Sequence, residues 1–114
     1  MKPRVFTILL AITLSFTILT SNASTDTDST AREKVQRLFE SDEEKIAQDA
    51  IWVDDVFKVH VFDNGSNRDE YAAYVCTVLS DHGFKGINVS VMVVDYTKLL
   101  QTRRTVILGQ AHCQ

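Results

Sequence analysis

Residues 31–50 carry apolar side chains at the spacing of one face of an α-helix. The stripe consists of Val35, Leu38, Phe39, Ile46, Ala47 and Ala50. Thr30 and Glu33 form a capping box ahead of the stripe, and this predicts that a helix begins at Ala31. A second capping box begins at Ser41, so the sequence leaves open one long helix to about Asp49 or two short helices.

The pattern changes from helical to alternating after Trp52. Residues 56–62, VFKVHVF, alternate apolar and polar side chains, and this period of two predicts a strand. Phe57, Val59 and Val61 lie on one face of it, and Lys58 and His60 lie on the other. The polar stretch DNGSN at 63–67 is a turn signal that ends the strand.

A second helix is predicted over residues 68–82, RDEYAAYVCTVLSDH. Its apolar side consists of Tyr71, Val75, Val78 and Leu79. Two overlapping capping boxes, which begin at Ser66 and Asn67, mark its start. At its end, His82 suits the negative end of the helix dipole and Gly83 suits a left-handed cap.

Two further strands are predicted near the C-terminus. In INVSVMVVDY, residues 87–96, the buried face is expected to consist of Ile87, Val89, Val91 and Val93. Residues 97–104, TKLLQTRR, form a connection that is compatible with a short helical turn capped by Thr97. The last strand, TVILGQAHC at 105–113, contains Gly109, which is expected to mark a β-bulge or a close approach by another segment.

The predicted order is therefore helix, strand, helix, strand, strand, and the predicted fold class is α+β. A strand, a helix and a second strand favour a crossover with parallel pairing. The last two strands are expected to pair antiparallel as a hairpin with a longer loop. The expected result is a small three-stranded mixed sheet with the helices on one face and one disulfide.

The N-terminal residues have the features of a secretory signal peptide. Lys2 and Arg4 give a positive start, an apolar stretch of about 15 residues follows, and small residues precede a cleavage site after Ala23. The alternative is an uncleaved membrane anchor, but the stretch is shorter than the roughly 20 residues that span a bilayer. No membrane span is expected after the signal peptide is removed. The predicted organisation is a signal peptide at 1–23, a flexible polar leader at 24–30 and a single domain at 31–114.

The charge of the mature chain argues against nucleic acid as a partner. Cleavage removes two of the 12 Lys and Arg residues and none of the 15 Asp and Glu residues, which leaves a formal charge of −5. Proteins that bind phosphate backbones concentrate Lys and Arg on one face instead.

The two cysteines predict both a compartment and a cross-link. Cys76 lies on the second predicted helix and Cys113 lies one residue from the C-terminus. Two cysteines usually pair in an oxidising compartment and stay free in the cytosol. No C-x-x-C motif indicates redox chemistry. We therefore predict a secreted or periplasmic protein with a structural disulfide that holds its last strand to the helix.

No motif indicates catalysis. Ser90 lies on a predicted strand with no predicted base nearby, and the sequence contains no glycine-rich phosphate loop. The carboxylate pairs Asp54-Asp55 and Asp69-Glu70 fall at a strand entrance and in a first helical turn, where they are ordinary. The sequence predicts neither an enzyme nor a cofactor.

His60 and His112 are the weak alternative, as part of a small-ligand or metal-binding module. Both lie on predicted strands, and their rings could converge with Asp54 or Asp55 if those strands were neighbours. No H-x-H or H-x-x-x-H spacing supports a site, so no metal is expected.

Two surface features favour a protein partner. Lys98, Arg103 and Arg104 concentrate positive charge in an otherwise acidic protein, and Trp52 and Tyr96 lie near strand ends. The simpler explanations are a solvated turn for the cations and lids over the core for the aromatic residues, yet aromatic residues and arginine are enriched in binding patches. The leading interpretation is a small exported, non-catalytic interaction protein, for example a periplasmic inhibitor or an immunity-type protein.

Overall fold

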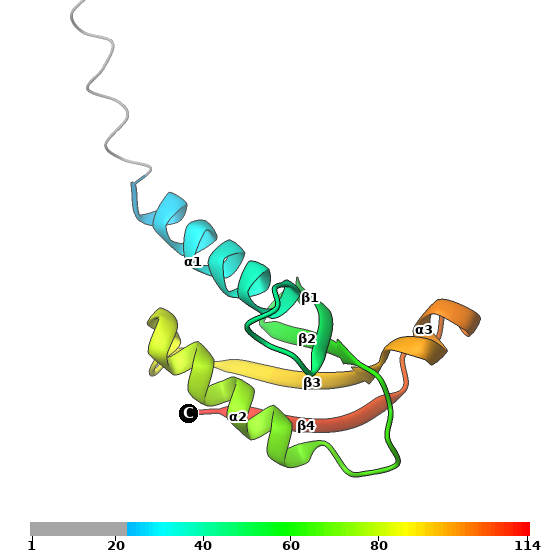
Figure 1. Cartoon of the computed structure of the whole chain (residues 1–114). Coiled ribbons are helices and arrows are strands. Elements are labelled where there is room, and N and C mark those ends of the chain that lie inside the picture. Colours follow the sequence, from blue (N-terminus) through cyan, green and yellow to red (C-terminus); the bar gives the residue numbers. More distant parts are fainter. Residues whose placement is uncertain (1–22) are drawn as a thin grey trace, which may run out of the picture.

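The computed structural model describes residues 23–114, so the predicted signal peptide lies outside the described residues apart from Ala23. Two helices, α1 (Ala23–Glu40) and α2 (Asp69–Leu79), cover one face of a mixed β-sheet, and α3 (Tyr96–Thr102) projects from one end of it (Figure 1). The predicted α+β class is confirmed. Within residues 23–114, no helix is both long and apolar enough to cross a membrane.

The sheet has four strands in the order β1-β2-β3-β4. Their bounds are Ala47–Val53, Val56–Val61, Val89–Asp95 and Ile107–Cys113. β2 and β3 pair in parallel across the α2 crossover, and β3 and β4 pair antiparallel. Both pairings agree with the prediction, whereas the antiparallel β1–β2 hairpin was not predicted.

The prediction of three strands is wrong because β1 occupies part of the segment predicted to be helical. Its register shifts between Ala47 and Asp49, so Ala47 and Ala50 both face the core at a spacing that imitates a helix. The sequence left open one helix or two over residues 31–50, and neither is found. α1 ends at Glu40, where the Ser41 hydroxyl donates to the Leu38 carbonyl at 2.7 Å instead of capping a new helix.

Helix α1 begins at Ala23, before the start that the Thr30 capping box predicts. The segment 24–30, predicted as a flexible leader, therefore lies within its first turns. This segment contains no proline or glycine that would stop a helix from extending through it.

The predicted capping boxes are not found at the start of α2, because the side chain of Asp69 binds the backbone of β4 instead. The Asp69 carboxylate accepts from the Gln110 backbone N–H at 2.9 Å, and the Asn67 side chain accepts from the Asp69 N–H at 2.7 Å. At the other end the prediction is confirmed. Gly83 is left-handed with φ 101°, within a π-helical turn, η2 (Ser80–Phe84), that continues α2.

Gly109 shows both features predicted for it. The β3–β4 register shifts between Val93 and Val94, beside Gly109, and the chain entering α2 passes directly over it. A Cβ atom at Gly109 would lie 2.2 Å from the carbonyl carbon of Arg68. Only glycine allows the helix and the strand to approach this closely.

The strand predicted at 87–96 begins later, at Val89, and Ile87 is exposed. The predicted buried positions Val89, Val91 and Val93 are confirmed. The short helix α3 is capped by Asp95, whose carboxylate accepts from the Lys98 backbone N–H at 3.0 Å, and not by Thr97.

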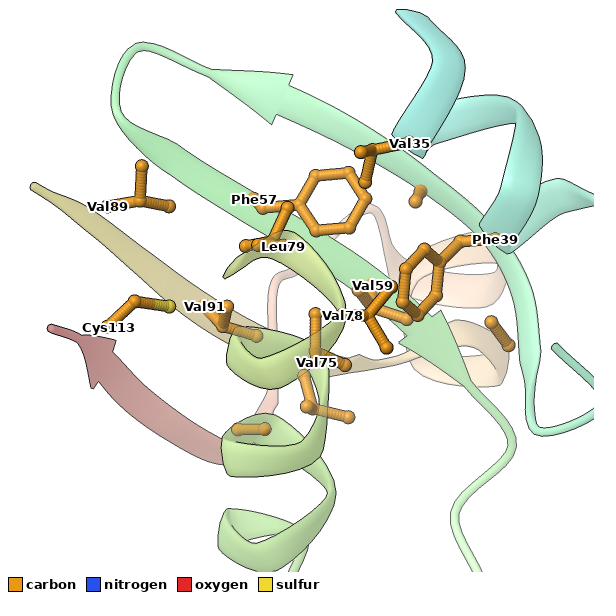
Figure 2. Close-up of a cluster of buried hydrophobic side chains, with 14 of the residues drawn as sticks. Val35, Phe39, Phe57, Val59, Val75, Val78, Leu79, Val89, Val91 and Cys113 are labelled. Atoms are coloured by element: carbon orange, nitrogen blue, oxygen red, sulfur yellow. The ribbon is translucent and has the colours of Figure 1, made fainter. Parts of the chain in front are cut away.

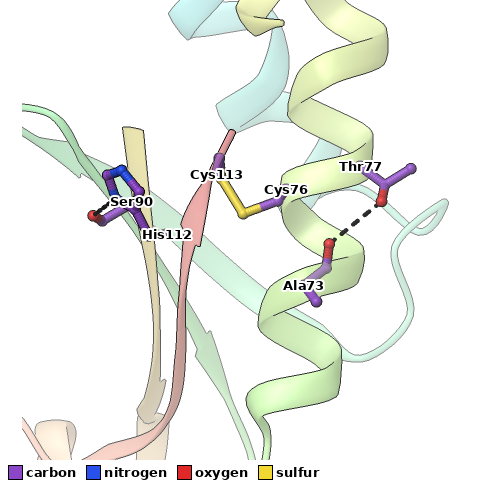
Figure 3. Close-up of a disulfide and its surroundings, with 6 residues drawn as sticks. All are labelled: Ala73, Cys76, Thr77, Ser90, His112 and Cys113. Carbon is purple, nitrogen blue, oxygen red and sulfur yellow. Dashed lines mark hydrogen bonds between the residues drawn. A yellow bond between two sulfur atoms is a disulfide. The ribbon is translucent and has the colours of Figure 1, made fainter. Parts of the chain in front are cut away.

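The core lies between the helices and the sheet. Figure 2 shows side chains of α1 and α2 meeting those of β2 and β3, with Phe39 and Phe57 in edge-to-face contact at 5.3 Å. The predicted disulfide joins Cys76 of α2 to Cys113 of β4 across a Cα–Cα distance of 5.2 Å (Figure 3). The last strand is thus tied to the helix that covers it.

We expect removal of the disulfide to destabilise the fold because it closes a loop with a sequence separation of 37. The chain-entropy model gives a loss of about 3–4 kcal/mol of unfolding free energy. Urea unfolding with and without reductant measures this loss, and the double variant Cys76→Ser, Cys113→Ser should reproduce it without reductant. An unchanged unfolding midpoint after reduction would contradict the prediction.

We expect Gly109→Ala to lower the unfolding free energy by about 2–3 kcal/mol, because the new methyl group would press on backbone atoms of Arg68. Gly65→Ala is the matched control. Gly65 has φ +85° with nothing within 4 Å, so alanine there costs only the backbone strain, about 1 kcal/mol. Equal losses for the two variants in thermal unfolding would show that the close approach carries no steric cost.

Candidate interaction surface

The second face of the sheet carries a regular grid of side chains. Since Phe57, Val59 and Val61 point to the helices, the alternate residues point to the other face, here called the open face. Strand register arranges them in three cross-strand rows. The rows are Val53, Val56, Ser90 and His112; Ile51, Lys58, Met92 and Gln110; and Asp49, His60, Val94 and Ile107.

Much of the open face is aliphatic and exposed to solvent. Ile51, Val53 and Ile107 expose 46%, 43% and 47% of their surface, and Met92 lies half-buried between the strands. Lys58 stands in the middle row between Ile51 and Met92. In the described part of the chain, no side chain forms a hydrogen bond or ion pair with Lys58.

The first residue of α3, Tyr96, covers part of the row that contains His60. Tyr96 stacks over His60 with ring centroids 6.3 Å apart, and Phe62 contacts the edge of the same tyrosine at 5.6 Å. The His60 ring also pairs with the carboxylate of Asp49 across the β1–β2 hairpin. His60 is therefore buried, and Tyr96, predicted as a possible contact residue, serves as its cover.

Ser90 and His112 form a hydrogen-bonded pair on the open face. Ser90 Oγ lies 3.1 Å from His112 Nδ1, and both side chains point away from α2 (Figure 3). They line a shallow hollow of about 320 Å³ together with Met92 and Gln110. The expectation that Ser90 has no base nearby is wrong, because β3–β4 register, which the sequence did not reveal, puts His112 directly opposite it.

This pair has two of the groups that nucleophilic catalysis requires, a hydroxyl and a base. A catalytic histidine is normally oriented by a third group at its other ring nitrogen. Within residues 23–114, Ser90 is the only side chain that His112 contacts through a hydrogen bond. The arrangement can bind a polar group by hydrogen bonding.

The sheet keeps His60 and His112 apart. β2 and β4 flank β3 on opposite sides, and the two histidines pair with Val94 and Ser90 of β3. The separation is about 13 Å along the strands and about 10 Å across them. Among the residues that the structure describes, no group of three His, Cys, Asp or Glu side chains could hold a metal ion.

Trp52 is part of the core margin and not a free contact residue. Its ring lies 4.7 Å from Phe57 and 5.2 Å from Phe84, and its indole N–H donates to the Arg32 carbonyl at 3.1 Å. The Arg32 guanidinium covers the ring at 4.5 Å. Trp52 thus joins α1 to the hairpin.

The predicted basic residues lie at the α3 end of the sheet. Lys98 of α3 and Arg103 and Arg104 of the following connection are all exposed, as is Leu100 beside them. Arg103 ends α3 in the left-handed conformation with φ 61°. The structure places these cations around a solvated turn, at the rim of the open face and not within it.

Ile51 and Val53 of the open face were missed because β1 was not predicted, whereas Ile107 lies on the predicted last strand and faces this side because of the register shift beside Gly109. The β-branched Ile51 and Val53, followed by the Asp54-Asp55 turn and a clear strand, are the signal that could have revealed the hairpin. Comparison of the chain with models of known protein families, with curated proteins and with solved structures finds no match.

Proposed function

We propose that this protein is a small exported, non-catalytic protein that binds another protein through the open face of its sheet. The observation that carries the proposal is the exposure of Ile51, Val53 and Ile107 on a face without a covering helix. Single exposed apolar residues are common, but a set of them on one rigid face is typical of an interaction site.

The chemistry of the open face suggests the partner. Burial of Ile51 and Met92 requires an apolar partner surface, and Lys58 between them would lose its hydration in the complex. A buried charge needs an opposite charge, so we expect a carboxylate of the partner opposite Lys58. Ser90, His112 and Gln110 offer hydrogen bonds at the margin.

The disulfide supports export to an oxidising compartment, either the periplasm or the cell exterior. The negative charge of the mature chain does not favour nucleic acid as a partner. An inhibitor or an immunity-type protein is the specific class that we propose, because such proteins recognise a target through a rigid surface and need no catalytic residues of their own.

Export predicts a definite mature chain. Intact mass spectrometry of the protein expressed with its own N-terminus should give residues 24–114 with Cys76 and Cys113 linked. Recovery of the uncleaved chain with both thiols open to alkylation would contradict the proposal that this protein is exported.

Binding through the open face predicts different effects for two isoleucines of nearly equal exposure. Ile51 exposes 46% of its surface on the open face and Ile87 exposes 45% in the loop before β3. A partner captured from periplasmic extract by the wild-type protein should bind Ile51→Asp about 10- to 30-fold more weakly, because the carboxylate would be buried unpaired. It should bind Ile87→Asp unchanged.

A charge reversal gives a second comparison for the same partner. Lys58→Glu should weaken binding, whereas Lys85→Glu, which reverses an exposed charge in the loop before β3, should not. Circular dichroism and thermal unfolding check that every variant remains folded. Equal losses in the two members of either pair, or no partner retained by the wild-type protein, would overturn the proposal.

A further inference from the structure

A second hollow lies on the helical side of the molecule, between the α1–β1 connection and α2. Its volume is about 390 Å³, and its lining is mostly apolar. Ile46 and Tyr74 expose 45% and 46% of their surface there, and Tyr71 forms part of the wall. These residues and those of the open face lie on opposite sides of the sheet, so the two surfaces are independent.

Two stacked tyrosines form the aromatic wall of this hollow. The rings of Tyr71 and Tyr74 lie 5.8 Å apart with an interplanar angle of 26°. In the part of the chain that the structure describes, the buried hydroxyl of Tyr71 has no hydrogen-bond partner. Aromatic faces carry partial negative charge and attract cations.

Carboxylates stand at the rim of the hollow. The Tyr74 hydroxyl donates to Glu44 Oε2 at 2.8 Å, which fixes this carboxylate beside the rings, and Glu43 lies next to it. Burial, and then the charge of Glu44, raises the pKa of Tyr71. Lys45 is the single cation in the lining, and Glu40 and Asp42 line the adjoining hollow.

We propose that this hollow binds a lysine or arginine side chain of a basic segment in a protein partner. The aliphatic stem would pack on Ile46 and the tyrosine rings, and the cationic head would meet Glu43 and Glu44. An anionic group would face two carboxylates, and a purely apolar group would desolvate them without compensation. The occupant that satisfies both the apolar wall and the acidic rim is therefore a long cationic side chain.

The test uses hexalysine as the probe and hexaglutamate as its charge-reversed control, with the disulfide-bonded protein followed by ¹H–¹⁵N NMR. We expect saturable shifts centred on Ile46, Tyr71 and Tyr74 with hexalysine and none with hexaglutamate. Glu44→Gln should weaken hexalysine binding about tenfold. Glu33→Gln, which makes the same chemical change on α1 away from the hollow, should leave it unchanged.

Tyr74→Phe and Tyr74→Ala separate the two roles of this side chain. Phenylalanine keeps the aromatic wall and loses only the hydroxyl that holds Glu44, so it should weaken binding less than alanine does. Shifts that spread over all acidic residues and respond equally to Glu44→Gln and Glu33→Gln would overturn the proposal, as would the absence of saturable shifts. Neither outcome depends on the open face, whose residues are unchanged in these variants.

Discussion

The burial of one face of the sheet under α1 and α2 is the interaction on which the rest of the structure depends. Phe39 of α1, Leu79 of α2 and Phe57 of β2 are fully buried at its centre. Burial of such side chains contributes roughly 1.5–3 kcal/mol each, which makes this layer the main source of stability in a chain this small. Because both helices lie on the same face, the other face must meet solvent or a partner.

Two sets of contacts hold the helices to the edges of the sheet. At the β4 edge, the disulfide, the close approach over Gly109 and the Asp69–Gln110 hydrogen bond all join α2 to the last strand. At the β1 edge, Trp52 and Arg32 join α1 to the hairpin. These contacts make the sheet rigid, and a rigid face loses little conformational entropy when it binds.

The two proposed surfaces have complementary chemistry. The open face is aliphatic with a central lysine, whereas the hollow beside Tyr71 and Tyr74 is aromatic with an acidic rim. A partner could engage either without the other, since they lie on opposite sides of the sheet. As proposed, the open face would meet an acidic group of a partner and the hollow a basic one.

The sequence by itself determined the elements whose side chains carry a strong local signal. The alternation of β2 and β3, the apolar stripe of α2 and the left-handed Gly83 follow from local spacing and backbone preference. The pairing of the two cysteines followed from their number and the predicted compartment. Gly109 was recognisable because a glycine inside a strand implies a bulge or a close neighbour.

Only the tertiary structure decided the features that depend on strand register and long-range contact. The shift between Ala47 and Asp49 made β1 imitate a helix, and Ser90 met His112 only because β3 and β4 align them. Local spacing carries no information about which distant residues become neighbours across a sheet, and a shift of one residue moves a side chain to the other face. The sequence therefore determined most of the elements, whereas the open face and its rows of side chains were decided by their assembly.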